Sequence, residues 1–290
     1  MMMPFVLRVL CVVLVFSMVF TFELLASTSL PQTQRGLVAD DFRKARPKST
    51  KPVKTSGHAG RTSPRYTPAT PIAQPFGPNA VQVGLTIWKM ERVLGFTSAD
   101  RSGQWQWISK RVAADTKFKD GEVIRLSFES PRAGYLYVIN RDALTDGSYG
   151  ATKLIFPVRG EDNSLEAGKL IDIPAEDQPP FRASPSARQA GELLTILVTS
   201  EPLPLLLTDV ELPLSSGQLI EWEAKWGGLA QRFDMSGGVG QVRTDAEQQA
   251  ASRKRARELT RADPAPQTIF VVSPRNNDGL LFNLMLSYIR

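Results

Sequence analysis

Hydrophobic and polar residues alternate along short segments of the chain that begin at Val81. In residues 122–129, Ile124, Leu126 and Phe128 alternate with more polar neighbours, which is the period of two of a half-buried β-strand. Similar segments, rich in β-branched and aromatic residues, give eight predicted strands: 81–89, 122–129, 134–140, 153–156, 170–173, 192–199, 268–273 and 280–289. Eight short, closely spaced strands favour a mainly β fold, an Ig-like two-sheet β-sandwich over residues 80–290.

The first of two predicted peripheral helices follows a capping box. Ser215 stands three residues before Gln218, a spacing that is typical of a helix start. Leu219, Trp222 and Trp226 then fall at i, i+3 and i+7 and share one face. We expect this face to dock on the sandwich.

The second predicted helix follows Thr244 and Glu247, which form a Thr-x-x-Glu capping box. Residues 248–259 are rich in Ala and Arg and have little apolar surface. The pattern therefore predicts a helix on the outside of the domain.

The last predicted strand, 280–289, is too apolar for a free tail and should be paired in a sheet. Asp278 and Gly279 are turn residues, so we expect a hairpin between 268–273 and 280–289. Residues 81–89 should lie beside this hairpin, because the ends of a domain are commonly close together.

The beginning of the chain has the layout of an export signal. An apolar block of 14 residues, 9–22, follows Arg8 and precedes the small residues 26–29. Such a block is short for a transmembrane helix, which needs about 20 residues. We interpret residues 1–29 as a signal peptide, or else as an N-terminal membrane anchor that uses residues 9–25. Either reading places the protein outside the cytoplasm, in the periplasm or secreted.

Residues 30–79 read as a disordered, basic, Pro-rich linker. The stretch 31–78 contains eight prolines and nine Lys or Arg against two Asp, with almost no periodic apolar pattern. The net charge of this stretch is therefore +7, whereas that of the whole chain is +6 and that of residues 79–290 is −1. A nearly neutral folded domain argues against nucleic acid as a partner.

Cysteine and histidine limit the available chemistry. Cys11 and His58 are the only residues of their kind, and both precede the predicted domain. A Cys nucleophile, a Cys or His zinc site and a Ser-His-Asp triad all require residues that the domain lacks. We accordingly predict no catalytic residue, no metal site and no cofactor.

Five segments carry a family resemblance. They are FKDGEVIRLS at 118–127, GYLYVINRD at 134–142, LIFP at 154–157, AGKLIDIP at 167–174 and ELLTILVTSEPL at 192–203. Together they resemble the bacterial family called domain of unknown function 4384. The resemblance covers residues 118–203, and the flanking segments LTIWK at 85–89 and DPAPQTIF at 263–270 look like the longer variant of the same domain. It implies an exported protein with a binding or accessory role, since no catalytic residues are assigned to that family.

Six residues form the candidate interaction surface. Tyr135 and Tyr137 share a strand face, which could instead pack against the second sheet. Asp142 and Asp146 lie in a loop that could hold Ca²⁺, although the EF-hand spacing is absent and turns favour Asp and Gly for other reasons. Trp222 and Trp226 could form part of a sugar site, or could belong to the core.

Two functions follow from these observations. The first is an exported, non-enzymatic β-sandwich module that binds a protein or a cell-envelope polymer, held near the membrane if its N-terminal segment is uncleaved. The second is a hydrolase of the envelope that uses carboxylates or a Ser-Lys pair, because neither needs histidine. A cleft that gathers two or more acidic side chains would favour the hydrolase.

Overall fold

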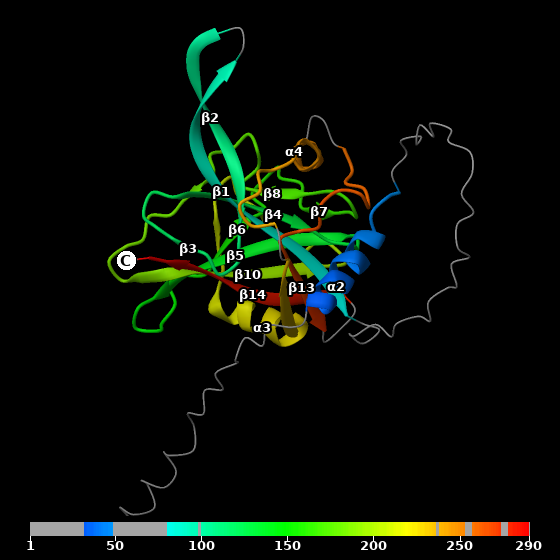
Figure 1. Ribbon diagram of the computed structural model, residues 1–290. Coiled ribbons are helices and arrows are strands. Elements are labelled where there is room, and N and C mark those ends of the chain that lie inside the picture. Colours follow the sequence, from blue (N-terminus) through cyan, green and yellow to red (C-terminus); the bar gives the residue numbers. More distant parts are fainter. Residues whose placement is uncertain are drawn as a thin grey trace, which may run out of the picture. The chain divides into compact units, whose positions relative to one another are not determined.

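The protein is mainly β and is built from two sheets (Figure 1). The computed structural model describes residues 32–48, 80–97, 100–235, 238–252, 257–273 and 278–289. The first sheet contains β12 (Leu229–Asp234), β13 (Thr268–Ser273), β1 (Val81–Thr97), β4 (Val123–Glu129) and β8 (Ile171–Ile173), with β2 (Asp100–Val112) on β1 and β9 (Phe181–Arg182) on β4. The second contains β11 (Leu212–Pro213), β6 (Lys153–Phe156), β5 (Gly134–Leu144), β10 (Gln189–Thr199), β14 (Gly279–Tyr288) and β3 (Lys117–Phe118), with β7 (Ser164–Leu165) on β5. The predicted two-sheet sandwich is confirmed.

All eight predicted strands are present, and their inward residues form the core between the sheets. Leu85 and Ile87 of β1 and Leu126 and Phe128 of β4 are buried there, in line with their period of two. The strands that the pattern missed have two residues each (β3, β7, β9 and β11), are largely polar (β2) or are largely exposed (β12). Short or polar strands form because a neighbouring strand pairs with them, and the local sequence gives little sign of this.

The predicted C-terminal hairpin is wrong. Strand β13 belongs to the first sheet, where Val272 pairs with Val81 of β1, as expected for the neighbouring segment 81–89. Strand β14 belongs to the second sheet, where it pairs with β10 and β3. Phe270 and Phe282 stack with ring centroids 4.5 Å apart. The two strands therefore lie in different sheets, and their apolar side chains meet across the core, as the inner faces of a sandwich do.

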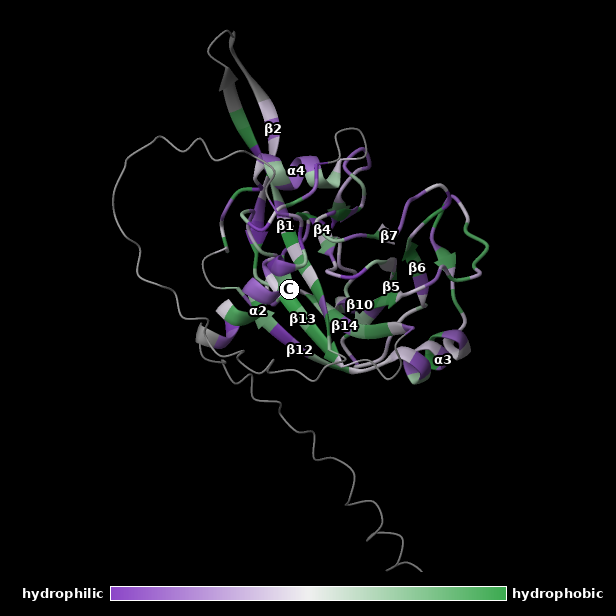
Figure 2. Ribbon diagram, turned by 90° about the vertical axis from the view of Figure 1, so that its right-hand side faces the viewer, coloured by the Kyte–Doolittle hydropathy of each residue, from purple (hydrophilic) through white to green (hydrophobic). Residues whose placement is uncertain are grey.

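Helix α3 (Ser216–Trp226) docks on the outer face of the second sheet, as its apolar face predicts. The Gln218 backbone N–H donates to Ser215 Oγ at 3.1 Å, which begins the helix. Leu219, Trp222 and Trp226 are buried against the sheet. Figure 2 shows α3 lying beside β10 and β14 at the edge of the view.

Helix α4 (Asp245–Ala251) is shorter and more buried than its sequence predicts. The capping box of Thr244 and Glu247 is confirmed. However, Ala246, Glu247 and Ala250 are buried, because α4 packs over the outer face of the first sheet. The helix does lie on the outside of the sandwich, but one of its faces is buried against the sheet, which its sequence did not indicate.

Helix α2 (Gln32–Lys44) corrects the prediction of a disordered linker for part of residues 30–79. Its residues Val38 and Phe42 are buried, and Arg46, just beyond the helix, is buried as well. Two apolar residues at i and i+4 form a docking face that the average composition of the stretch conceals. Residues 1–31 and 49–79, with the predicted signal and most of the linker, lie outside the described residues. Within the described part of the chain, no helix is long and apolar enough to cross a membrane.

Gly84 on β1 leaves room for α2. A Cβ added at Gly84 would lie 2.3 Å from Pro266 Cγ and 2.8 Å from Phe42 Cζ. We expect Gly84→Ala to lower the free energy of unfolding by about 1–3 kcal/mol, because the contact can be relieved only by displacing these rings. Gly36→Ala is the control, since a Cβ at Gly36 meets nothing within 4 Å. Urea unfolding measures both, and equal stability of the two variants would contradict this packing.

Candidate functional site

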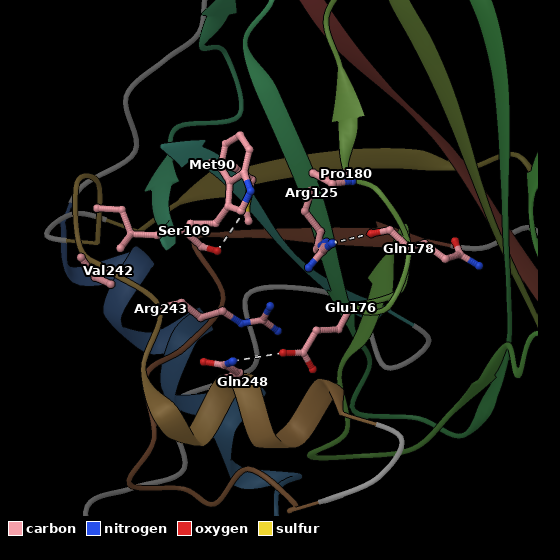
Figure 3. Close-up of a pocket in the computed structure, with 11 residues that line it drawn as sticks. Met90, Ser109, Arg125, Glu176, Gln178, Pro180, Val242, Arg243 and Gln248 are labelled. Carbon is pink, nitrogen blue, oxygen red and sulfur yellow. Dashed lines mark hydrogen bonds between the residues drawn. The ribbon is translucent and has the colours of Figure 1, made fainter. Parts of the chain in front are cut away.

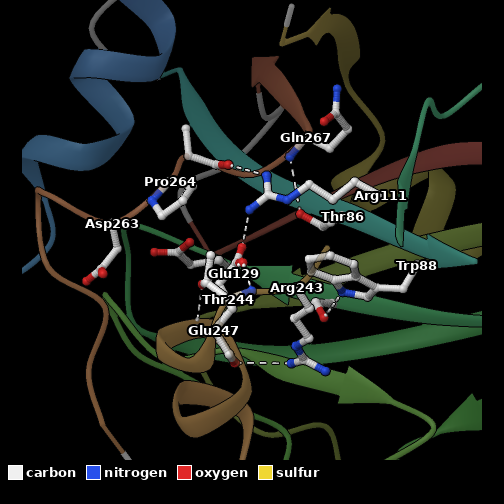
Figure 4. A network of polar contacts seen from close by, with 12 residues as sticks. Thr86, Trp88, Arg111, Glu129, Arg243, Thr244, Glu247, Asp263, Pro264 and Gln267 are labelled. Atoms are coloured by element: carbon white, nitrogen blue, oxygen red, sulfur yellow. Dashed lines mark hydrogen bonds and ion pairs between the residues drawn. The ribbon is translucent and has the colours of Figure 1, made fainter. Parts of the chain in front are cut away.

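The outer face of the first sheet is polar but buried. The register places Gly84 of β1 opposite Glu129 of β4, Thr86 opposite Ser127 and Trp88 opposite Arg125. The alternation in β4 predicts a solvent-exposed polar face, and this is wrong, because all seven residues of β4 are buried. Helices α2 and α4 and the chain near Pro264 lie over this face (Figure 4).

Three buried ion pairs connect the sheet to its cover. Arg46 forms a bidentate pair with Glu129, at 2.7 Å from Nε and 2.6 Å from a terminal nitrogen. Arg111 of β2 pairs with Glu247 of α4. Arg243 pairs with Asp172 at 2.7 and 3.1 Å, and its side chain is only 7% exposed.

Trp88 lies at the centre of this network. The guanidinium carbons of Arg111 and Arg243 are each 5.3 Å from its ring centroid, which is within the range of cation–π contacts. Its indole N–H donates to Ser127 Oγ at 2.7 Å, and Ser127 in turn donates to Asp172. These charged groups have partners, so the network holds the cover on the sheet.

A pocket of about 370 Å³ opens beside this network. We call it the arginine pocket, and it is lined by Met90, Trp107, Ile108, Ser109, Arg125, Glu176, Gln178, Pro180, Val242, Arg243 and Gln248. Figure 3 shows the side chains of Arg125, Arg243, Glu176 and Gln248 converging on one space. They come from β4, from the chain before α4, from the segment between β8 and β9, and from α4 itself.

Arg125 differs from the other buried arginines because it has no carboxylate partner. It is 6% exposed and donates to the Gln178 carbonyl at 3.0 Å, while its buried Nε has no hydrogen-bond partner. No side chain within the described ranges forms a salt bridge with it. Burial lowers the pKa of Arg125, although Asp172 opposes this shift. An anion that enters the pocket would stabilise this buried, unpaired guanidinium by charge and by hydrogen bonds.

Glu176 is the one carboxylate among the residues that line the pocket. It is exposed, and one of its oxygens accepts a hydrogen bond from Gln248 Nε2 at 3.0 Å. Water screens its charge, whereas Arg125 is shielded from water. Glu176 therefore opposes an anion in the pocket less than its full charge would suggest.

A β-ribbon of β1 and β2 rises from the pocket. Beyond Met90, β1 pairs only with β2, and the ribbon projects from the sandwich in both views (Figures 1 and 2). The register sets Met90 opposite Ser109, Arg92 opposite Trp107 and Leu94 opposite Trp105. Directly opposite residues share a face of the ribbon, so these six residues form one surface, which we call the ribbon face.

The ribbon face is exposed, aromatic and basic. Trp105 is 61% exposed and Trp107 is 49% exposed. The Arg92 guanidinium carbon lies 5.3 Å from the Trp105 ring centroid and 5.8 Å from that of Trp107. Met90, Trp107 and Ser109 belong both to the ribbon face and to the arginine pocket. The two features thus make one continuous surface.

Four of the six residues of the predicted interaction surface are brought together, but in a hydrophobic cluster and not on an open surface. Trp222 and Trp226 of α3 are buried against Tyr137 and half-buried Tyr135 of β5, so the tyrosine face packs against a helix and not against the first sheet. Asp142 and Asp146 are exposed. The backbone N–H and hydroxyl of Ser148 donate to Asp146, and these bonds lower the pKa of its carboxyl.

The described residues contain no group of three or more His, Cys, Asp or Glu that could hold a metal ion. Asp146 is engaged in its own turn, which is the ordinary role of Asp in a loop. The arginine pocket and the ribbon face were missed by sequence reasoning. Trp105 and Trp107, two positions apart, were the available signal, but the polar residues around them hid the strand that carries them.

Comparisons with known proteins give no relative. No family model matches the chain, and no curated protein or solved structure is significantly similar to it. The resemblance of residues 118–203 to domain of unknown function 4384 therefore stays a prediction, and the function has to be argued from the site.

Proposed function

We propose that this chain is a non-enzymatic binding module that acts outside the cytoplasm and binds an extended cell-envelope polymer or a protein. The location rests on the export signal predicted for residues 1–29. The binding role rests on one observation: the ribbon face, with two exposed tryptophans, continues into a pocket that holds a buried arginine without a carboxylate.

Exposed tryptophans at neighbouring positions are costly in a protein that has no partner for them. Monomeric proteins rarely expose contiguous apolar patches, and such patches commonly mark binding sites. Tryptophan and arginine are also the residues that contribute most often to binding hot spots. The ribbon projects from the sandwich, so a long ligand can lie along it and reach the arginine pocket at its base.

The alternative, a hydrolase, is supported less well. The arginine pocket holds only Glu176 among the carboxylates. A second pocket of about 430 Å³ is lined by Asp162 and Asp172. However, Asp172 is held by Arg243 and Ser127, and Asp162 accepts hydrogen bonds from the backbone and hydroxyl of Ser164. Labelling by a serine-reactive fluorophosphonate, lost on mutation of one serine, would favour the hydrolase.

The binding proposal predicts that the double variant Trp105→Ala/Trp107→Ala loses at least tenfold in affinity for bacterial envelope material. A tenfold change corresponds to about 1.4 kcal/mol, which is a modest loss for two aromatic contacts. Sedimentation of the full chain with envelope fractions measures it. The matched control is Tyr149→Ala, since Tyr149 is an equally exposed aromatic residue, 51% exposed, under Arg141 at 5.1 Å. Sedimentation no greater than that of an unrelated β-sandwich domain, or an unaffected double variant, would contradict the proposal.

A further inference from the structure

The arginine pocket is built to receive a carboxylate. Arg125 projects from β4, an interior strand of the first sheet, where it pairs with Trp88 of β1 while β9 and β8 pair with the residues just before and just after it. A guanidinium presents its donors as a planar fork that matches the two oxygens of a carboxylate. The nearby Arg243 already has its carboxylate, Asp172, whereas Arg125 donates only to a carbonyl in the hydrogen bonds of the described residues.

The ribbon face fits flat rings that lie beyond the pocket. Trp107 borders the pocket, and Trp105 follows on the same face at about 6.6–6.8 Å farther along the strand, from the rise per residue of a β-strand. Indole rings offer a flat apolar surface with a negative face. Sugar rings have one apolar face of C–H groups, which suits such a platform. Arg92 adds a positive charge between the two indoles.

We infer that the ligand is an acidic polysaccharide, in which one sugar carboxylate pairs with Arg125 in the arginine pocket while neighbouring sugar rings stack on Trp107 and Trp105. This inference rests on the proposed function and deepens it, because it names the chemical class of the polymer. An acidic peptide could use Arg125, but it offers no regular flat rings for the two indoles. A neutral polysaccharide could use the indoles, but it leaves Arg125 without an anion.

The direct test is binding of the full chain to oligogalacturonate and to the same oligosaccharide after reduction of its carboxyl groups, at low ionic strength. We expect the acidic form to bind at least tenfold more tightly. The difference should shrink as salt is added, because part of it is electrostatic. Isothermal titration calorimetry measures both affinities, and the two ligands differ only in the carboxylate.

Substitutions at two positions in the pocket should act in opposite directions. Arg125→Gln should abolish the preference for the acidic form, and Arg125→Lys should leave a weaker preference, because lysine keeps the charge but loses the planar fork. Glu176→Gln should tighten binding of the acidic form a few-fold and leave the reduced form unchanged, since it removes a like charge. The control is Arg182→Gln, which removes an exposed arginine from β9 of the same sheet.

The outcomes separate this inference from the proposed function. Equal binding of the two oligosaccharides, lost in Trp105→Ala/Trp107→Ala but not in Arg125→Gln, would overturn the acidic ligand and leave the binding module standing. Comparable binding of poly-glutamate would overturn the polysaccharide in favour of an acidic peptide. Failure of both oligosaccharides to bind, with envelope sedimentation intact, would overturn the inference alone. If Arg125→Gln does not fold, the other two variants still test the inference. It requires a weaker preference for the acidic form in Arg125→Lys and tighter binding of the acidic form in Glu176→Gln.

Discussion

Replacement of Arg46 by alanine in the full chain is expected to lower the free energy of unfolding by about 3–5 kcal/mol, because removal of one partner of a buried ion pair leaves the other charge uncompensated. The Arg46 and Glu129 side chains are 1% and 2% exposed. Arg46 also donates to the carbonyls of Asp263 and Pro264, at 3.0 Å each, so it holds the chain before β13 as well as β4. Chemical denaturation of the variant at pH 7 measures the loss.

Arg43→Ala is the matched control, because Arg43 lies on the same segment and its pair with Asp40 is partly exposed. Exposed pairs contribute about 0–1 kcal/mol, so this variant should differ little from the parent protein. Equal losses in the two variants would mean that the docking of residues 32–48 does not depend on the buried pair.

The Arg46→Ala defect should also depend on pH. Burial raises the pKa of Glu129, while Arg46 opposes the shift, so removal of Arg46 should raise this pKa further. An acid whose pKa is higher in the folded protein loses stability as the pH rises from its unfolded pKa through its folded one. The defect should therefore be larger at pH 8 than at pH 5, and a defect that grew on acidification would contradict the role of Glu129.

A chain that ends after Ser273 is expected not to fold and to aggregate. It lacks β14, which lies between β10 and β3 in the second sheet and buries Leu280, Phe282, Leu284, Leu286 and Tyr288 in the core. Its loss would remove one wall of the core and expose the edge of β10. Size-exclusion chromatography and thermal unfolding test this, and a monomer that unfolds like the full chain would contradict it.

Two substitutions at neighbouring positions of β14 test whether its core-facing side chains, and not only the presence of the strand, are needed for folding. Leu284→Asp places a carboxylate at a position that is 4% exposed and faces the core, whereas Met285→Asp places it at a position that is 39% exposed. The first should prevent folding, because a buried unpaired charge is too costly, and the second should be tolerated. Similar behaviour of the two would mean that β14 does not belong to the core.

Helix α2 and Arg46 change the result expected when residues 1–78 are deleted. The sequence favours a folded fragment after deletion of residues 1–78, since its periodic pattern begins only at Val81. The structure places Val38, Phe42 and Arg46 in buried positions, so such a fragment would lack part of its cover. The boundary lies before α2, and the charge of residues 32–48 belongs to the folded domain.

The sequence by itself determined the local structure of this protein. Short runs of β-branched and aromatic residues, with clear alternation in 122–129, located eight strands. Two capping-box patterns located the starts of α3 and α4. Both kinds of signal depend on residues within one element. Only the tertiary structure showed that β14 belongs to the second sheet and that the polar side chains of β4 are buried. It alone also showed where the arginine pocket forms. Arg46 and Glu129 are 83 residues apart, and Arg125, Glu176 and Arg243 come from different segments. Whether a charged residue is solvated depends on the element that covers it, and that element is chosen by long-range packing.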